Sequence, residues 1–382
     1  MKITDIKCCT IKGLYGDWIL VRVCTDAGID GFGEAFPTGR NQGQGIREMV
    51  LWMKNLLLGE DPENVDKLWH KMYQRQIYRG CSMAGALTTA ISGIEIALWD
   101  IAGKAHNVPI YKLLGGKHRD KIRVYSDFDG RDEKDYMSTA RRAKEIVDLG
   151  FTALKMDVDL YMWRDTQDSN HPMTRSELNH IKNLVGAVRE YAGDDIDIAV
   201  DCHSGFTTAD ALKVADALEP YNLMWLEEPV PPKDLDAMAR INQSTKTPIC
   251  AGENWFTQYE FRDVFAKQAV DIVMPDIQKC GGILCGKRIA DLAAVNYTQF
   301  APHCVASPIG QMATVQLCAS VANFLVLEWH MIDTPWWNEI IKTDAPIVSD
   351  GYIKVPEGPG IGIELNKDAI MKYLIIGEDF FD

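Results

Sequence analysis

The stretch AVDCHSGF, residues 199–206, sets the interpretation of the whole chain. A run of residues typical of a buried strand ends in Asp201, and His203 follows two positions later, before a Ser-Gly pair interrupts the strand. Side chains at positions i and i+2 of a strand point to the same side. A carboxylate and an imidazole are therefore expected to emerge together at one strand end.

Short apolar runs recur from residue 121 onward, and each is followed by a stretch in which apolar residues have helical spacing. The eight runs are KIRVYS (121–126), FTALKMD (151–157), DIDIAVD (195–201), LMWLEE (223–228), TPICAGE (247–253), VDIVMPD (270–276), TQFAPH (298–303) and FLVLEW (324–329). Most of them follow one another at about 22 to 30 residues, and an insertion near 160–175 lengthens one interval. Eight alternating strands and helices of this size predict a barrel of the TIM type.

The first third of the chain predicts a separate α+β unit. Residues 1–35 alternate like strands, with a hairpin in WILVRVCTDAGIDGFGEA, and apolar spacing predicts helices between about 43 and 115. The Pro/Gly-rich stretch DGYIKVPEGPGIGIELN predicts an extended segment that returns to the first domain. We expect an α/β fold with an α+β capping domain at 1–120, a barrel at 121–335 and a returning segment at 336–382.

Composition excludes several classes of partner. The hydrophobic content of 47% and charged content of 25% are ordinary for a globular protein, and the formal net charge of −14 argues against nucleic-acid or anionic-membrane partners. The ten cysteines contain no C-x-x-C pair, and no apolar run reaches the length of about 18 residues expected of a membrane span. We therefore predict a cytoplasmic protein with reduced thiols.

Ionisable residues end seven of the eight predicted strands. They are Lys155, Asp157, Asp201, His203, Glu227, Glu228, Glu253, Asp276, His303 and Glu328. Active sites of this barrel fold lie at the carboxyl ends of the strands. A stable barrel needs no charge there, and a buried unpaired charge costs several kcal/mol. We infer that a functional site compensates these charges.

Three of these carboxylates come from successive strands. Asp201, Glu227 and Glu253 are separated by 26 residues at each step. Three anions in one low-dielectric place repel each other unless a cation lies between them, and oxygen ligands of this kind favour Mg²⁺. A solvated acidic rim is the alternative, but the matched spacing favours a metal site.

These features resemble the enolase superfamily, in its mandelate racemase subgroup, over essentially the whole chain. The motifs that carry the resemblance are WLEEP (225–229), AGEN (251–254), PDIQKCGG (275–282) and ISGIEIALWDIAGK (91–104). The resemblance implies a modified (β/α)₇β barrel in which Asp201, Glu227 and Glu253 bind Mg²⁺. It also implies that His303 abstracts a proton and that Asp276 orients it.

The chemistry implied by the resemblance is removal of the proton next to a carboxylate. General base catalysis contributes about 10²–10⁴-fold, so most of the stabilisation must come from the metal ion. Within the subgroup, a His at the position of His203 is typical of sugar-acid dehydratases, whereas racemases have Asn. We expect His303 to take the C2 proton and His203 to protonate the departing 3-OH, and Glu328 resembles the acid that hydrogen-bonds the substrate carboxylate.

One motif departs from the racemase pattern. Racemases and lactonising enzymes of the family carry K-x-K at the end of the second strand, whereas this chain has KMD. Lys155 is expected to bind the substrate carboxylate or to offset negative charge. Asp157 either contacts a sugar hydroxyl or pairs with Lys155. Because the second lysine is missing, the motif favours one-way elimination over racemisation.

Candidates for substrate specificity lie in loops. In the family a loop of the capping domain closes over the barrel, and here it lies near GLYGDW (13–18), which makes Tyr15, Asp17 and Trp18 candidates. Trp329, with His330 and PWWNE (335–339), is a second group, and the polar, aromatic insertion 161–177 predicts a lid. The alternative for Trp18 and Trp329 is packing in the protein core.

The leading hypothesis is Mg²⁺-dependent dehydration of an aldonate, such as galactonate or gluconate, to a 2-keto-3-deoxy acid by a homo-oligomer, a dimer or an octamer. A racemase or epimerase of a 2-hydroxy acid on the same fold is the alternative. A barrel metal hydrolase is disfavoured because VYSDFD (124–129) lacks an H-x-H motif. A non-catalytic family member is disfavoured because each expected metal and dyad residue is present.

Overall fold

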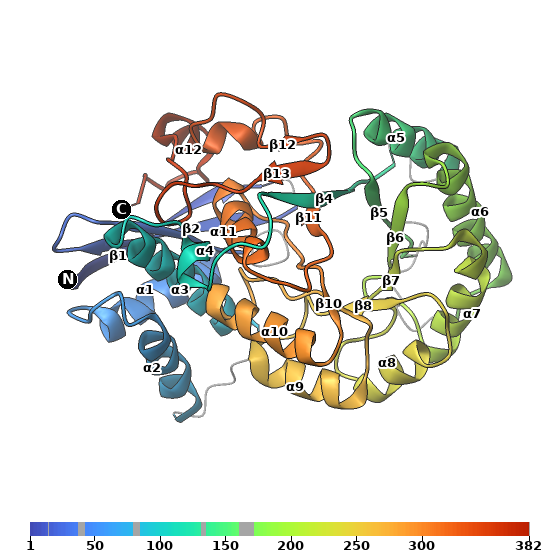
Figure 1. Ribbon diagram of the computed structural model, residues 1–382, viewed down its shortest axis with the longest axis horizontal. Coiled ribbons are helices and arrows are strands. Elements are labelled where there is room, and N and C mark those ends of the chain that lie inside the picture. Colours follow the sequence, from blue (N-terminus) through green and yellow to red (C-terminus); the bar gives the residue numbers. More distant parts are fainter. Residues whose placement is uncertain (14, 37–42, 79–84, 131–134, 160–171, 382) are drawn as a thin grey trace.

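The computed structural model describes residues 1–13, 15–36, 43–78, 85–130, 135–159 and 172–381. It consists of a capping domain, which contains the N-terminus, beside a barrel of strands surrounded by helices (Figure 1). Most of the predicted lid at 161–177 lies outside the described residues. Its last residues, 175–177, form the first turn of a barrel helix.

The capping domain is a three-stranded antiparallel sheet covered by helices. Its elements are β1 (Ile3–Lys12), β2 (Asp17–Thr25), β3 (Gly31–Ala35), α1 (Gly43–Leu57), α2 (Val65–Tyr78), α3 (Ala86–Ala105) and α4 (Ile110–Leu113). The predicted hairpin is confirmed as β2 and β3, and β1 pairs with β2. A Cβ atom on Gly33 would lie 2.1 Å from the carbonyl oxygen of Gly93, so glycine allows α3 to pack closely on β3.

All eight predicted barrel strands are confirmed. They are β4 (Lys121–Asp127), β5 (Ala153–Asp157), β6 (Asp197–Asp201), β7 (Trp225–Glu227), β8 (Ile249–Ala251), β9 (Ile272–Val273), β10 (Gln299–Phe300) and β11 (Leu327–Trp329). They run parallel in sequence order from β4 to β10, and β11 pairs with β4. A bridge between Phe300 and Phe324 joins β10 to the segment before β11, which closes the barrel.

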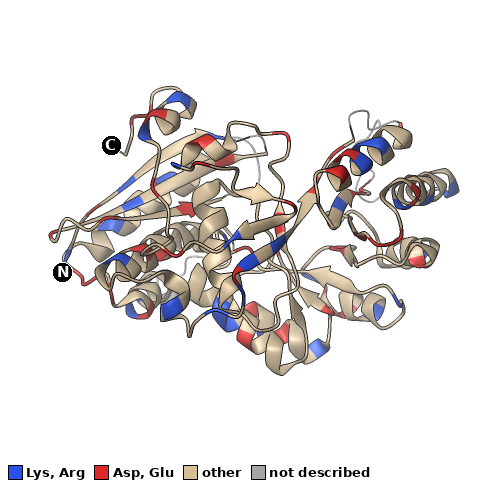
Figure 2. Ribbon diagram, turned by 45° about the horizontal axis from the view of Figure 1, so that its top comes forward, with Lys and Arg blue, Asp and Glu red and all other residues tan. Residues whose placement is uncertain are grey.

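Helices cover the outside of the barrel (Figure 1). They are α5 (Tyr136–Asp148), α6 (Arg175–Ala192), α7 (Thr208–Leu218), α8 (Leu235–Asn242), α9 (Thr257–Lys267), α10 (Ile283–Val295) and α11 (Pro308–Ala319), with a 3₁₀ turn, η1, at Glu219–Tyr221. Alternate strand residues such as Tyr125, Ala199 and Trp225 fill the barrel interior. Basic and acidic residues are interspersed on the outer helices (Figure 2).

The C-terminal segment returns to the capping domain, as predicted. It contains η2 (Trp337–Ile340), β12 (Val348–Ser349), β13 (Tyr352–Lys354) and α12 (Lys367–Tyr373). Strand β13 pairs antiparallel with the first half of β4, and the backbone N–H of Ile375 donates to the carbonyl of Thr10 in β1. The domain boundaries near residues 120 and 335 remain predictions.

Among the described residues, one helix is long and apolar enough to cross a membrane. This helix is α3, and 89% of its most apolar stretch is buried within the fold. The buried core helix of a globular domain has the same length and composition, so α3 is weak evidence for a membrane span. The cytoplasmic location and the homo-oligomeric state remain predictions.

Candidate active site

Strand register brings the predicted acidic residues to one end of the barrel. Asp157 at the end of β5 is paired with Asp201 of β6, which in turn is paired with Glu227 of β7. Residues at the same level of neighbouring parallel strands point to the same face of the sheet. The three carboxylates therefore lie side by side at the carboxyl ends of the strands, where this fold places active sites.

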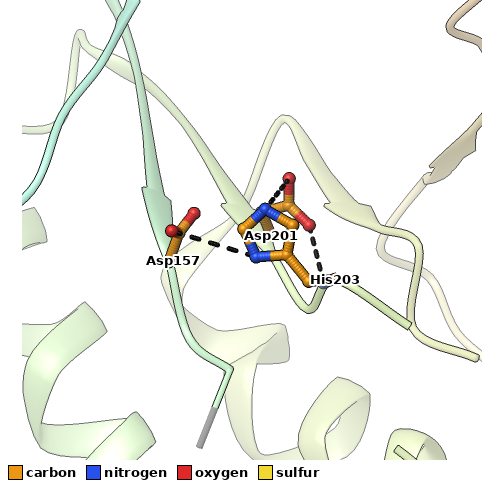
Figure 3. A group of neighbouring side chains, drawn as sticks. All are labelled: Asp157, Asp201 and His203. Carbon is orange, nitrogen blue, oxygen red and sulfur yellow. Dashed lines mark hydrogen bonds and ion pairs between the residues drawn. The ribbon is translucent and has the colours of Figure 1, made fainter. Parts of the chain in front are cut away.

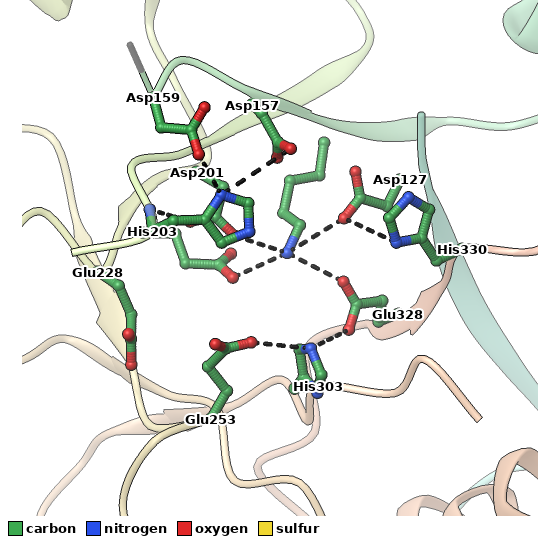
Figure 4. A network of polar contacts seen from close by, with 12 residues as sticks. Asp127, Asp157, Asp159, Asp201, His203, Glu228, Glu253, His303, Glu328 and His330 are labelled. Carbon is green, nitrogen blue, oxygen red and sulfur yellow. Dashed lines mark hydrogen bonds and ion pairs between the residues drawn. The ribbon is translucent and has the colours of Figure 1, made fainter. Parts of the chain in front are cut away.

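Lys155 is at the centre of the acidic site. Its side chain is 2% exposed, and its Nζ lies 2.8 Å from Glu227 Oε1, 2.9 Å from Glu328 Oε1, 3.1 Å from Asp201 Oδ2 and 3.3 Å from Asp127 Oδ2. Figure 4 shows the side chains of Asp127, Asp201 and Glu328 around this centre. Burial alone would lower the pKa of Lys155, but the carboxylates reverse the effect and hold it well above its usual value.

Asp127 is a member of this site that the sequence analysis missed. The first strand was predicted to end at residue 126, whereas β4 continues to Asp127. The sequence does contain a signal for Asp127, because this acid directly follows an apolar run, as acids do at the other strand ends. Because one ammonium is shared by four carboxylates in the described part of the chain, the site carries excess negative charge. It is therefore suited to bind a further cation.

His303 and Asp276 form the predicted pair. His303 Nδ1 lies 2.7 Å from Asp276 Oδ2, and Asp276 is fully buried. The other ring nitrogen, Nε2, lies 2.8 Å from Glu253 Oε2 and 3.5 Å from Glu328 Oε2. Burial by itself lowers the pKa of His303, but these two glutamates raise it well above 6.5. Asp276 thus fixes the ring and leaves Nε2 directed at the acidic site.

His203 lies beside Asp201, as the opening motif predicted (Figure 3). Its Nδ1 is 2.9 Å from Asp159 Oδ2 and 3.9 Å from Asp157 Oδ2, and its Nε2 is 3.7 Å from Asp201 Oδ2. The charge of Asp201 is the main reason that the pKa of His203 rises to about 12. His203 is therefore protonated at neutral pH. Asp159, which the sequence analysis did not select, holds its ring.

The oxygen-rich site fits a hard divalent cation. One atom each of Asp157, Asp201 and His203 lies within 4.8 Å of the others (Figure 3), and of these the two carboxylates can bind an ion, because the protonated ring of His203 has no free lone pair. The predicted carboxylate set overlaps this group at Asp201. Glu227 shares the Lys155 ammonium with Asp201, whereas Glu253 contacts the imidazole of His303.

Glu228 supports the neighbouring carboxylates. Its backbone has a φ of 34°, and its carboxylate accepts hydrogen bonds from Ser204 Oγ at 3.0 Å and Asn254 Nδ2 at 2.8 Å. The same Asn254 amide donates to Glu253 Oε1 at 2.8 Å. Burial raises the pKa of Glu228 to about 7. Glu228 therefore helps to hold Asn254, and through it Glu253, in place.

The two predicted substrate-binding tryptophans do not join the acidic cluster. Trp18 is 1% exposed, and its indole N–H donates to the carbonyl of Val305 at 3.0 Å. Trp329 follows Glu328 in the strand, so it points to the opposite face, where its ring stacks on Phe151 at a centroid distance of 5.6 Å. These contacts favour packing, and a direct contact with substrate remains a prediction for both residues.

The capping-domain loop reaches the barrel mouth through Tyr15. Its ring stacks on His330, with centroids 3.9 Å apart, and His330 Nδ1 lies 3.7 Å from Asp127 Oδ2. Burial lowers the pKa of His330 to about 3, so the imidazole is neutral. Of the loop candidates named from the sequence, Tyr15 is thus linked to the acidic cluster through His330 and Asp127.

Comparison with known families agrees with this geometry. The model described as "Mandelate racemase / muconate lactonizing enzyme, N-terminal domain" matches residues 14–115, and the model described as "Enolase C-terminal domain-like" matches residues 138–369. The chain belongs to the mandelate racemase/muconate lactonizing enzyme family of the enolase superfamily. The fold predicted from the motifs is therefore confirmed.

Similar proteins extend over nearly the whole chain. The D-xylonate dehydratase of Haloferax volcanii is 41% identical over 100% of this chain and 91% of its own length. The D-galactonate dehydratase of Klebsiella pneumoniae is 31% identical, covering 97% of this chain and 94% of its own. A crystal structure of a mandelate racemase/muconate lactonizing enzyme-like protein from Rubrobacter xylanophilus has a TM-score of 0.93 and 41% identity, covering 100% of this chain and 99% of its own. This chain is an enzyme of the hydro-lyase class.

Proposed function

We propose that this chain catalyses the Mg²⁺-dependent dehydration of an aldonate to a 2-keto-3-deoxy acid. The observation that carries the proposal is the pair of imidazoles on opposite sides of an acidic site. His203 follows the third barrel strand, β6, and His303 follows the seventh, β10. Asp276 holds the ring of His303, and the charge of Asp201 favours a proton on His203. Such a pair can remove a proton at one carbon and donate one to a group leaving the next.

His303 is proposed as the base that takes the C2 proton. Its Nδ1–H is donated to Asp276, which keeps Nε2 as the nitrogen that faces the site and stabilises the imidazolium once it forms. Glu253 contacts Nε2 at 2.8 Å in this structure. If Glu253 were a metal ligand instead, its charge would no longer favour a proton on Nε2, and Nε2 could accept the C2 proton.

His203 is proposed as the acid that protonates the leaving 3-OH. Asp159 at 2.9 Å fixes its Nδ1 side, and the negative charge of Asp201 favours the protonated ring. Transfer of this proton lets the hydroxyl leave as water rather than as hydroxide. The enol that results ketonises to the 2-keto-3-deoxy acid.

The acidic residues are proposed to hold Mg²⁺ and the substrate carboxylate. Asp201, Glu227 and Glu253 would be the metal ligands, and the bound ion would supply positive charge that stabilises the anion formed at the substrate carboxylate. Lys155, already in contact with Glu328 at 2.9 Å, would contact one carboxylate oxygen of the substrate. Burial alone would raise the pKa of Glu328, but His303 and Lys155 hold this pKa well below its usual value, so Glu328 would have to take up a proton before it could hydrogen-bond the other oxygen.

A five-carbon aldonate is the first substrate to test, because the relative at 41% identity is named a D-xylonate dehydratase. The experiment incubates purified protein and Mg²⁺ with D-xylonate, D-gluconate, D-galactonate and further aldonic and aldaric acids, and detects 2-keto-3-deoxy products with a carbonyl reagent. We expect one or a few acids to react, and we expect His303→Asn to abolish the product. Exchange of the C2 proton in D₂O without elimination would instead support the racemase or epimerase alternative.

A further inference from the structure

The capping domain contributes a buried carboxylate to the start of a barrel helix. Glu34 in β3 is fully buried. Its Oε1 accepts the backbone N–H of Ser307 at 2.9 Å, and its Oε2 accepts the backbone N–H of Gly310 at 3.0 Å and the hydroxyl of Ser307. Ser307 is the N-cap of α11, so Glu34 satisfies N–H groups that the helix leaves unpaired.

This helix begins directly after the loop that carries His303. Ser307 lies four residues after His303, and every residue between them is buried. The capping domain holds this loop at a second point, since Trp18 Nε1 donates to the carbonyl of Val305 at 3.0 Å. The backbone on the C-terminal side of His303 is therefore fixed by contacts from another domain.

The same helix turn also holds Asp276. The backbone N–H of Gln278 donates to Asp276 Oδ1 at 2.7 Å, and Asp276 Oδ2 contacts His303. The side-chain amide of Gln278 donates to the carbonyl of Gly310 at 3.1 Å and to the hydroxyl of Thr314 at 3.1 Å. Asp276 is thus connected to the helix start that Glu34 caps through the hydrogen bonds of Gln278, and His303 is connected to it through the four-residue step of backbone to Ser307.

We propose that Glu34 of the capping domain is a positioning residue that sets the geometry of the His303–Asp276 pair. This inference rests on the proposed function, in which His303 Nε2 removes the C2 proton. Glu34 acts through its hydrogen bonds to Ser307 and Gly310. Its docking against α11 aligns the base, so the barrel depends on the capping domain for chemistry as well as for substrate enclosure.

The substitution Glu34→Gln isolates this role. The amide has nearly the volume of the carboxyl group, but its NH₂ group donates and cannot accept a hydrogen bond. One of the N–H groups of Ser307 or Gly310 is then left facing a donor in a buried place, which displaces the helix start. Ser307→Ala is a milder second variant. It removes the hydroxyl, which donates to Glu34 and accepts the backbone N–H of Ile309, but it leaves both backbone bonds to Glu34.

Asp100 in α3 provides a matched control. It is also a buried capping-domain carboxylate that accepts two backbone N–H groups, from Phe32 at 2.9 Å and Ile361 at 2.9 Å, and it also contacts Lys104. These partners belong to the capping domain and the C-terminal segment, not to the loops of the pair. Asp100→Asn therefore disturbs the capping domain without disturbing the α11 start.

The kinetic test compares Glu34→Gln and Asp100→Asn in the full-length chain, with the reacting sugar acid and with its C2-deuterated form. We expect Glu34→Gln to lower kcat roughly 10- to 100-fold with KM changed less than about threefold, and to raise the primary isotope effect on kcat, because misalignment slows proton removal. Ser307→Ala should change kcat and the isotope effect less, and Asp100→Asn should leave both unchanged. An equal loss of kcat in Glu34→Gln and Asp100→Asn, with an unchanged isotope effect, would overturn the proposal.

A second readout does not depend on turnover. In ¹⁵N-histidine-labelled protein, the imidazole signals of His303 are assigned by their loss in His303→Asn. We expect Glu34→Gln to shift these signals and Asp100→Asn to leave them in place. If no sugar acid is dehydrated, the proposed function fails while this test still decides whether Glu34 positions the pair. Unshifted His303 signals in Glu34→Gln would refute the positioning role.

Discussion

Buried carboxylates occur in two regions of this molecule and are balanced in different ways. At the junction of the capping domain with the barrel and the C-terminal segment, Glu34, Glu95 and Asp100 each accept hydrogen bonds from two backbone N–H groups. At the barrel mouth, the Lys155 ammonium is shared by four carboxylates within the described ranges. The carboxylates at the junction find their hydrogen-bond donors within the fold, whereas the barrel mouth retains negative charge.

The same chemical group is therefore buried for two different purposes: at the junction the carboxylates hold the fold together, and at the mouth they favour cation binding. A buried carboxylate that is matched to fixed N–H dipoles orients the backbone around it. A group of carboxylates that share one cation repel each other, and the repulsion is relieved when a further cation binds. Substitutions in the two regions should therefore differ in whether they change activity, metal response or stability.

The largest expected effect is at the mouth. His203→Asn should lower the rate of dehydration roughly 10²–10⁴-fold, because the leaving hydroxyl loses its proton donor. Exchange of the C2 proton with D₂O should continue, since His303 and Asp276 are intact. Product formation and deuterium incorporation are measured on the same samples. Loss of exchange together with elimination would show that His203 does not act on the leaving group alone.

At the junction, the expected effect is on the pH dependence of stability. Burial raises the pKa of Glu95 from 4.5 to about 7, so the folded state holds a proton that the unfolded state releases between these pH values. The proton on Glu95 stabilises the folded state fully below about pH 4.5. This stabilisation is lost as the pH rises through about 7, which lowers the free energy of unfolding by about 3 kcal/mol. Urea unfolding between pH 5.5 and 8 should show this loss in the wild type.

Glu95→Gln should remove that part of the pH dependence, because the amide does not titrate. The exposed Glu219→Gln serves as the control and should retain the wild-type slope. An unchanged slope in Glu95→Gln would mean that another group causes the dependence.

Metal binding should distinguish the two regions. Mg²⁺ at about 100 times its dissociation constant should raise the free energy of unfolding by about 2.7 kcal/mol, since the ion binds the folded state. Asp201→Asn should abolish this increase, whereas Asp100→Asn at the junction should preserve it. Thermal unfolding of the two variants with Mg²⁺ and with EDTA measures this increase. Stabilisation that persists in Asp201→Asn would place the ion elsewhere.

The smallest expected effect is at a helix capped by its own local sequence. Thr174 Oγ1 accepts the backbone N–H of Glu177 at 3.2 Å, and Glu177 Oε2 accepts the backbone N–H of Thr174 at 2.6 Å, at the start of α6. Thr174→Ala should lower the free energy of unfolding by about 1 kcal/mol. The value of kcat should not change, in contrast to Glu34→Gln. A fall in kcat would show that loss of a helix cap is enough to impair catalysis.

The order of the barrel strands and most of the acidic residues were predictable from the sequence. Each strand is a short apolar run, and the two-residue period of a strand places Lys155 beside Asp157 wherever that strand lies. His203 was predicted beside Asp201 on the same ground, but β6 ends at Asp201, and a turn in which His203 has a φ of 41° brings the two together. The pairing of His303 with Asp276 followed from the family motifs. These features depend on local sequence and on a barrel whose strand ends meet on one rim.

Other features depended on contacts between distant parts of the chain. Trp18 and Trp329 pack away from the acidic cluster, and Asp127 completes the contacts of Lys155 because β4 extends one residue beyond the predicted strand. The bond between Glu34 and Ser307 spans 273 residues, and no periodicity in the sequence relates them. The alternation of side chains is a property of a single strand or helix. The sequence by itself therefore determined which residues end the barrel strands. The partner of the buried Glu34 was decided by the docking of one domain on the other, which only the tertiary structure contains.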